Sequence, residues 1–164
     1  MLMVAVSSNI MAQATNISAV PEVVASSFHN KYPNTTVERW KASEDKYIAK
    51  VSVDNHTCFV SFDANGNWIC TMSKIRWTHQ LPKTVYDAYK KSEYKSWDVY
   101  FITKIERPSG IYYQLIVDDR NAPVDSSHQP LFTNDKLLEF KADGGSEKVM
   151  DVSDNSATYM VYNK

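Results

Sequence analysis

The residues VPEVVASSF (Val20–Phe28) return in altered form as LPKTVYDAY (Leu81–Tyr89). Each stretch has a proline in second place, followed by apolar side chains at helical spacing. At a constant offset of 61 residues, Val20 matches Leu81, Val24 matches Val85, and Phe28 matches Tyr89. Similarity that returns once in this way predicts a duplicated supersecondary unit, because a solenoid needs several stacked copies.

The similarity continues into alternating patterns that predict strands. Tyr47, Ala49, Val51 and Val53 match Ile111, Tyr113, Leu115 and Val117, and Phe62 matches Phe132. Alternation of apolar and polar residues is typical of a strand with one buried face. We therefore expect one domain made of repeat one, about residues 20–76, and repeat two, about residues 81–142. Residues 143–164 form a C-terminal extension that could add a strand.

Each repeat is expected to begin with a short amphipathic helix and to continue with about four strands. The helices are predicted at residues 21–32 and 82–94. A proline near the first helical position is favourable there, because its missing N–H group would have no partner in any case. Helices that alternate with groups of antiparallel strands indicate the α+β fold class.

The sequence DANGN (Asp63–Asn67) is the strongest turn signal in the chain. A type I turn with Gly66 in the left-handed region predicts a bulged hairpin. The expected pairs are Phe62 with Trp68, Val60 with Cys70, and Cys58 with Met72, all on one apolar face. The turn also resembles the start of an EF-hand calcium loop. That loop requires glycine and glutamate where this chain has Trp68 and Lys74, so a plain turn is favoured.

The two cysteines, Cys58 and Cys70, would lie diagonally on that apolar face. Diagonal neighbours on a sheet are about 7–8 Å apart, which is too far for an easy disulfide. We therefore favour two buried thiols that pack as small apolar side chains. A disulfide stays open as the alternative if the register slips, because an oxidising compartment would favour it.

Composition and charge exclude several classes of function. A net charge of −1 provides no basic face for nucleic acid, and no run of about 18 apolar residues is present to span a membrane. Residues 1–14 are uncharged, begin with an apolar run and end in Ala-Gln-Ala. This pattern predicts a signal peptide whose start is truncated or mis-assigned, cleaved before Thr15. The alternative is a frayed apolar N-terminus.

No catalytic or metal-binding motif stands out in the sequence. The histidines are His29, His56, His79 and His128, and none has a partner at metal-ligand spacing. The sequence contains no Gly-x-Ser-x-Gly, no His-Glu-x-x-His and no phosphate-binding glycine-rich loop. We therefore expect no metal, no cofactor and no enzymatic activity.

Several stretches together resemble one protein family. Val20–Val24, Phe28–Pro33, Tyr47–Val51 and Phe62–Trp68 are similar to the PepSY-like, β-lactamase-inhibitor-like periplasmic proteins. The second copy fits less well, because it lacks the turn glycine and carries an insertion at residues 120–130. The resemblance covers about residues 20–142. It implies two tandem helix-plus-four-stranded antiparallel units that form one sheet with both helices on one face, in an exported bacterial protein without assigned catalytic residues.

The related secreted β-lactamase inhibitor grips its enzyme with a concave, aromatic-rich sheet face, so the resemblance draws attention to the strand positions opposite the helices. The candidates for a binding face there are Ile48, Phe59, Ile69, Tyr112, Ile116 and Leu137. Adjacent apolar residues rimmed by polar ones are typical of interaction surfaces. The alternative is that the C-terminal extension covers this face with a strand containing Tyr159, Met160 and Tyr162.

The function predicted from the sequence is that of an exported, non-catalytic binding or inhibitory module. It would dock a protein or peptide through its sheet face, as a periplasmic or secreted monomer. Two alternatives stay open: a small-ligand carrier with a cavity between helices and sheet, and a hydrolase whose site is assembled from distant residues. Inhibition of a β-lactamase does not follow, because a shared fold does not transfer an inhibitory contact.

Overall fold

The computed structural model describes residues 20–43, 45–119, 135–145 and 148–152. These residues form two α-helices, one 3-10 helix and eight strands. In chain order the elements are α1 (Glu22–Lys31), β1 (Val37–Ser43), β2 (Lys46–Val53), β3 (His56–Asp63), β4 (Trp68–Ile75), η1 (Thr78–Gln80), α2 (Lys83–Lys91), β5 (Asp98–Arg107), β6 (Gly110–Asp118), β7 (Lys136–Lys141) and β8 (Lys148–Asp151).

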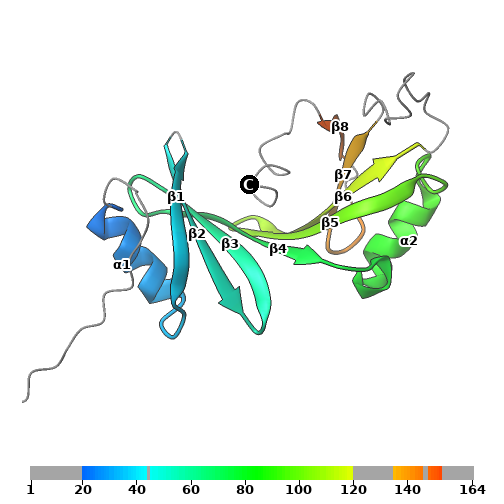
Figure 1. Ribbon diagram of the computed structural model, residues 1–164. Helices are drawn as coiled ribbons and strands as arrows, with labels where there is room; N and C mark the ends of the chain where they lie inside the picture. Colours follow the sequence, from blue (N-terminus) through cyan, green and yellow to red (C-terminus); the bar gives the residue numbers. More distant parts are fainter. Residues whose placement is uncertain (1–19, 44, 120–134, 146–147, 153–164) are drawn as a thin grey trace, which may run out of the picture.

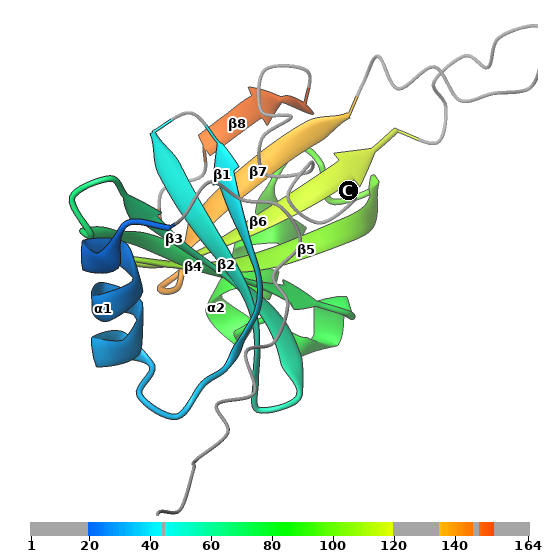
Figure 2. The same cartoon turned by 60° about the vertical axis from the view of Figure 1, so that its left-hand side comes forward.

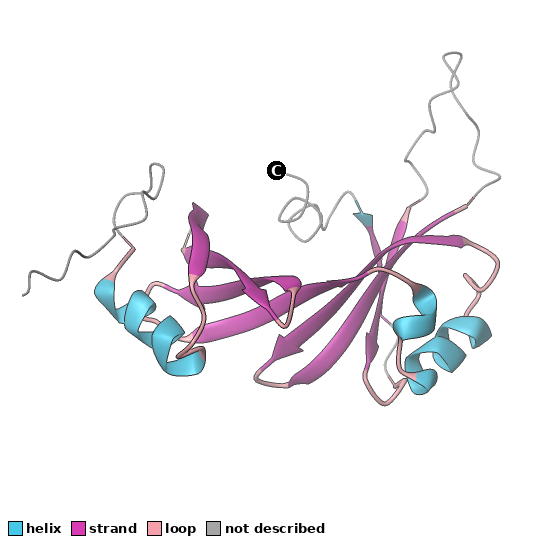
Figure 3. Ribbon diagram, turned by 60° about the horizontal axis from the view of Figure 1, so that its bottom comes forward, coloured by secondary structure: helices cyan, strands magenta, loops and turns pink. Residues whose placement is uncertain are grey.

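The eight strands form one antiparallel sheet in which every strand pairs with the next one along the chain (Figure 1). Helix α1 precedes the first four strands and α2 precedes the last four. Both helices lie on the same side of the sheet, near its two ends (Figure 3). The sheet is curved, with the helices on its convex side (Figure 1). The predicted arrangement of two tandem helix-plus-four-stranded units in one sheet is therefore confirmed.

Each helix begins directly after the proline of its repeat. The carbonyl oxygen of Pro21 accepts a hydrogen bond from the N–H group of Val24, and that of Pro82 accepts one from Tyr86. A proline suits this place because it supplies the carbonyl and has no N–H group of its own to satisfy. The repeated proline thus marks the start of both helices.

Each helix packs on its own half of the sheet. The core beneath α1 consists of Val24, Phe28, Ala49, Val51, Cys58, Val60 and Phe62. The core beneath α2 consists of Leu81, Val85, Tyr89, Ile102, Tyr113, Leu115, Val117, Leu138 and Phe140. Phe28 and Tyr89, which match in the repeat, are both buried in these cores. The apolar stripe of each repeat therefore packs its helix against its own half of the sheet in the same way.

The β3–β4 hairpin differs from the prediction in its register. Phe62 pairs with Trp68 as predicted, but Ile69 is an extra residue that forms a β-bulge. The pairs that follow are Ser61–Cys70, Val60–Thr71, Phe59–Met72 and Cys58–Ser73, so the predicted pairs of Val60 with Cys70 and of Cys58 with Met72 are wrong. One extra residue moves every later side chain of the strand to the other face.

Cys58 and Cys70 consequently lie on opposite faces of the sheet. Cys58 belongs to the core beneath α1, whereas Cys70 packs on the other face beside Phe59 and Met72. The prediction that they share a face is wrong, and both are free thiols. Burial raises the pKa of each thiol.

The turn between β3 and β4 is held by the carboxylate of Asp63. Its Oδ1 accepts hydrogen bonds from the N–H groups of Asn65 and Asn67, at 2.9 and 2.8 Å, and its Oδ2 accepts one from Asn67 Nδ2 at 2.8 Å. The hydrogen bonds from Asn67 lower the pKa of Asp63. Gly66 has a φ of 81°, in the left-handed region that favours glycine. These contacts agree with a plain turn.

The sheet ends with β8, which lies beside β7 (Figure 2) and beyond residue 142, within the C-terminal extension. The turn between these strands is attached to α2, because Thr84 Oγ1 donates to the carbonyl oxygen of Ala142 at 2.7 Å. Some predictions concern residues outside the described ones: the signal peptide at 1–14, the match of Phe132, the insertion at 120–130, and the strand with Tyr159, Met160 and Tyr162.

Candidate binding surfaces

The sheet face opposite the helices, here called the concave face, carries its side chains in three rows that cross the strands. The polar row joins the cross-strand neighbours Lys74, Thr103, Gln114, Glu139 and Lys148, on β4 to β8. The first apolar row is Met72, Ile105 and Tyr112, with Ile48, Phe59 and Cys70 packed against it. The second apolar row is Phe101, Ile116, Leu137 and Met150, with Val152. A polar strip thus runs between two apolar ones.

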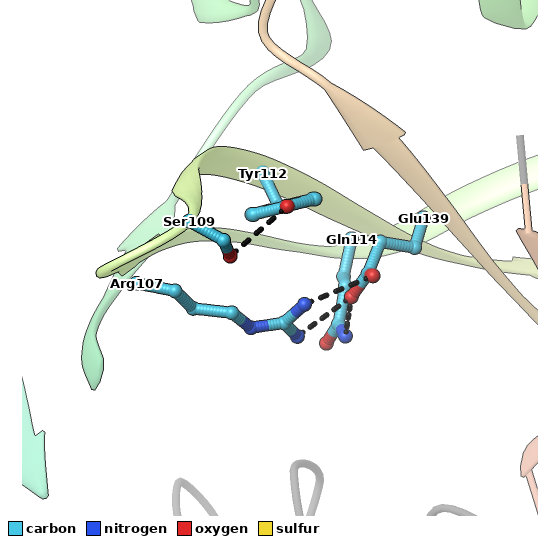
Figure 4. A network of polar contacts seen from close by, with 5 residues as sticks. All are labelled: Arg107, Ser109, Tyr112, Gln114 and Glu139. Atoms are coloured by element: carbon cyan, nitrogen blue, oxygen red, sulfur yellow. Dashed lines mark hydrogen bonds and ion pairs between the residues drawn. The ribbon is translucent and has the colours of Figure 1, made fainter. Parts of the chain in front are cut away.

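Arg107 and Glu139 form a bidentate ion pair on this face (Figure 4). Arg107 Nη1 donates to Glu139 Oε1 at 3.0 Å, and Nη2 donates to Oε2 at 2.8 Å. The guanidinium carbon lies 4.7 Å from the centre of the Tyr112 ring. Two parallel hydrogen bonds and the ring contact together fix the orientation of the guanidinium.

The same carboxylate orients Gln114, whose Nε2 donates to Glu139 Oε2 at 2.6 Å. Burial acts to raise the pKa of Glu139, but the hydrogen bonds from Arg107 and Gln114 outweigh it, so the pKa is lowered. Glu139 is therefore ionised at neutral pH and holds the amide nitrogen. The amide oxygen of Gln114 is left as a free acceptor.

Two atoms of the polar row, Thr103 Oγ1 and Gln114 Oε1, are buried and have no hydrogen-bond partner. The two residues face each other directly across β5 and β6, and they are only 1% and 5% exposed. A buried polar group without a partner costs about 1–3 kcal/mol. Native structures contain few such groups, so this pair of neighbours requires an explanation.

Five of the six predicted face residues lie on the concave face, in two separate rows, and do not form one patch. The first apolar row contains Ile48, Phe59 and Tyr112, the second contains Ile116 and Leu137, and the bulge residue Ile69 belongs to neither. Four of the six, Ile48, Phe59, Ile116 and Leu137, are 2–9% exposed. These four are packed against their neighbours, whereas Tyr112 and Ile69 are half-buried.

Sequence reasoning missed Arg107 and Thr103. One signal was available: Thr103, Gln114 and Glu139 are polar residues in the middle of otherwise apolar strands. Their alignment into one row depends on the register of three strands, which no single stretch of sequence reveals.

A second candidate surface is a groove of about 1180 Å³ on the convex side, between the two repeats. It is lined by the β2–β3 turn, by the end of β4 with η1, and by β5. Two large aromatic residues of its lining are exposed, Trp77 by 57% and Tyr100 by 44%. Lys104 and Glu106, also in the lining, form an ion pair at 2.7 Å, and the hydrogen bond between them raises the pKa of Lys104.

Within the part of the chain that the structure describes, no three His, Cys, Asp or Glu side chains gather as metal ligands. No helix there is long and apolar enough to cross a membrane.

The tandem fold and the sequence agree with one family. A family model described as "Putative beta-lactamase-inhibitor-like, PepSY-like" matches residues 9–61 and 50–129. The chain belongs to this family. The two overlapping matches are consistent with two tandem units, and the description points to a non-catalytic protein. A comparison with curated proteins finds no similar sequence.

Solved structures from Bacteroides species have the same fold. A DUF2874 family protein from Bacteroides ovatus is 25% identical, with a TM-score of 0.70 over 84% of this chain and 91% of that one. A BLIP-like protein from Bacteroides fragilis is 24% identical, with a TM-score of 0.68 over 84% and 91%. A protein from Bacteroides eggerthii, described as one of the "putative periplasmic proteins", is 16% identical, with a TM-score of 0.64 over 82% and 92%.

Proposed function

We propose that this protein is an exported, non-catalytic binding module that docks a protein or peptide on its concave face. The observation that carries the proposal is the pair of buried, unpaired atoms at Thr103 and Gln114, between two apolar rows. Such atoms need hydrogen-bond partners. Both described helices lie on the opposite side of the sheet and cannot supply them (Figure 3). A docked polypeptide would, once it displaces the groups that bury the two atoms.

The polar row defines what the partner must offer. Because Gln114 Nε2 is held by Glu139, its Oε1 would accept an N–H group of the partner. The hydroxyl of Thr103 can donate to a carbonyl or accept a second N–H group. A peptide group carries one donor and one acceptor. An extended backbone, or an asparagine or glutamine side chain, therefore matches this pair better than a charged group does.

The predicted face residues take two roles in this proposal. Ile48, Phe59, Ile116 and Leu137 are packed and shape the rows on either side of the polar strip. Tyr112 is half-buried and would contact the partner directly. Apolar contacts around a polar centre exclude water and strengthen the hydrogen bonds inside.

Export is part of the same proposal. It rests on the pattern of residues 1–14 and on the likeness in fold to the Bacteroides eggerthii protein that is described as one of the "putative periplasmic proteins". The place of action would be the periplasm or the outside of the cell, and the module would act as a monomer.

Capture from a periplasmic extract tests the proposal, with bound proteins quantified by mass spectrometry. Gln114→Leu removes the proposed acceptor, and Tyr86→Ala on α2 serves as the control because this residue is exposed on the convex side. A true partner is retained by the wild type and by Tyr86→Ala, but about ten-fold less by Gln114→Leu. Equal retention of every captured protein by both variants would refute docking at this face.

Two further experiments address covering of the concave face by the C-terminal extension and inhibition of a β-lactamase. A chain that ends at Val152 lacks most of the C-terminal extension, so a gain in capture would assign the covering of this face to residues 153–164. A direct assay with purified β-lactamases tests inhibition, which the proposal does not require.

A further inference from the structure

The two repeats separate on the convex side because β3 and β4 stop pairing before either strand ends. The last pair is Cys58 with Ser73. Strand β3 begins two residues earlier, at His56, and β4 continues to Ile75, still paired with β5. The edges of the two strands therefore diverge at this point, and the convex groove of about 1180 Å³ opens between them.

The size of the groove favours a polypeptide over a small ligand. Pockets for small molecules measure about 300–1,000 Å³, and this groove exceeds that range. Two strand edges border it, at His56–Thr57 and at Lys74–Ile75. An extended peptide can add to an exposed strand edge through backbone hydrogen bonds and place alternate side chains against the walls.

The wall beside η1 presents an aromatic ring and a cation. Gln80 Oε1 accepts hydrogen bonds from the N–H groups of Arg76 and Trp77, at 3.2 and 3.1 Å, and thereby fixes the backbone that carries both side chains. The Trp77 side chain is more than half exposed, which is unusual for a tryptophan. Among the described residues, Arg76 makes no ion pair.

The charge beside η1 favours an acidic side chain at that wall. Lys74 faces the concave side, where its Nζ lies 4.9 Å from the centre of the Phe101 ring, and Lys104 is paired with Glu106. The side-chain charges left to the groove are Arg76 beside η1 and Asp54 at the β2–β3 turn. A carboxylate of the occupant would therefore pair with Arg76, at the wall that also carries Trp77.

We propose that this groove is a second binding site, which takes an extended peptide segment of another protein with alternating acidic and aromatic side chains. An aromatic side chain of the peptide packs on Trp77, a carboxylate pairs with Arg76, and the peptide backbone pairs with the edge of β4. The site lies on the opposite side of the sheet from the polar row, so it is independent of docking on the concave face.

Isothermal titration calorimetry with three synthetic peptides tests this site. The probe is the N-acetylated, C-amidated peptide Asp-Phe-Asp-Phe-Asp, compared with Lys-Phe-Lys-Phe-Lys and Asp-Ser-Asp-Ser-Asp. We expect the dissociation constant of the acidic aromatic peptide to be at least about ten-fold lower than that of either other peptide. Trp77→Ala and Arg76→Glu should each weaken binding of the acidic aromatic peptide about ten-fold, whereas Arg76→Lys should keep most of the affinity.

Control variants distinguish this site from the concave face. Tyr86→Ala removes an exposed aromatic residue that is not part of the groove, and Gln114→Leu alters only the concave face. Both should bind the acidic aromatic peptide as the wild type does. The proposal is overturned if no peptide binds, if the lysine peptide binds equally well, or if Trp77→Ala and Arg76→Glu leave the affinity unchanged.

Discussion

Thr71 on β4 and Thr103 on β5 are both buried, but only the hydroxyl of Thr71 is hydrogen-bonded. Thr71 Oγ1 lies 2.8 Å from the hydroxyl of Tyr32 and accepts a hydrogen bond from Trp68 Nε1 at 3.0 Å. Thr103 Oγ1 has no partner. Thr71 therefore links the end of α1, through Tyr32, to the convex side of the sheet. The hydroxyl of Thr103 lies on the concave side and makes no hydrogen bond.

The first prediction follows from this difference. Thr103→Val should raise the free energy of unfolding by about 1 kcal/mol, because valine has nearly the same shape and removes a buried group without a partner. Thr71→Val should lower it by about 1–2 kcal/mol, because the Tyr32 and Trp68 groups lose their partner. Urea denaturation of the two variants measures both changes. A clear loss of stability in Thr103→Val would show that its hydroxyl is satisfied in the free protein.

The second prediction concerns pH. The pKa of Glu139 is lowered from its ordinary value of 4.5 in the folded chain. Its contribution to stability is therefore complete above that ordinary value and is lost as the pH falls through the lower folded value. The free energy of unfolding of the wild type should fall more steeply below about pH 4.5 than that of Glu139→Gln.

At neutral pH, Glu139→Gln should cost about 1.5–3 kcal/mol, because it leaves the guanidinium of Arg107 without its charged partner. Glu93→Gln is the control, since Glu93 is exposed and should change neither the stability nor its pH dependence. Parallel acid profiles of the wild type and Glu139→Gln would contradict the assigned ion pair.

The third prediction concerns the thiols. Because Cys58 and Cys70 lie on opposite faces of the sheet, protein purified without reductant should contain two free thiols after denaturation. In the folded protein both should react slowly with a thiol reagent at pH 8, because burial keeps them protonated. A spectrophotometric thiol titration, with and without denaturant, measures both quantities. Recovery of no free thiol would mean that the register of β3 and β4 differs from the one described.

The sequence predicted the fold well because the same local signals occur twice. The prolines at 21 and 82, with the apolar stripes that follow them, specify two helices, and alternation specifies the strands. The bulge at Ile69 was not predictable in the same way. A turn signal limits the position of a bulge to a few residues, and a shift by one residue reverses the faces of Cys70 and Met72.

The candidate sites were harder to predict than the fold. Thr103, Gln114 and Glu139 are separated along the chain and become neighbours only through two strand registers. The groove depends on where β3 and β4 stop pairing, which alternation does not encode. The structure places Ile48, Phe59, Tyr112, Ile116 and Leu137 in the two apolar rows, but their burial depends on packing across each whole row, which the sequence does not reveal.

The fourth prediction compares two glycines in turns. Gly66 and Gly110 both have a positive φ, 81° and 132°, which disfavours alanine at either position. At Gly66 a Cβ atom would also lie 2.7 Å from Ser27 Oγ and 2.9 Å from the carbonyl oxygen of Val23, whereas at Gly110 it meets no atom within 4 Å. Gly66→Ala should therefore lower the free energy of unfolding by about 1–3 kcal/mol more than Gly110→Ala does, because of these two close contacts. Thermal unfolding of the two variants measures the difference. Equal losses would mean that α1 does not pack as closely on the β3–β4 turn as the structure has it.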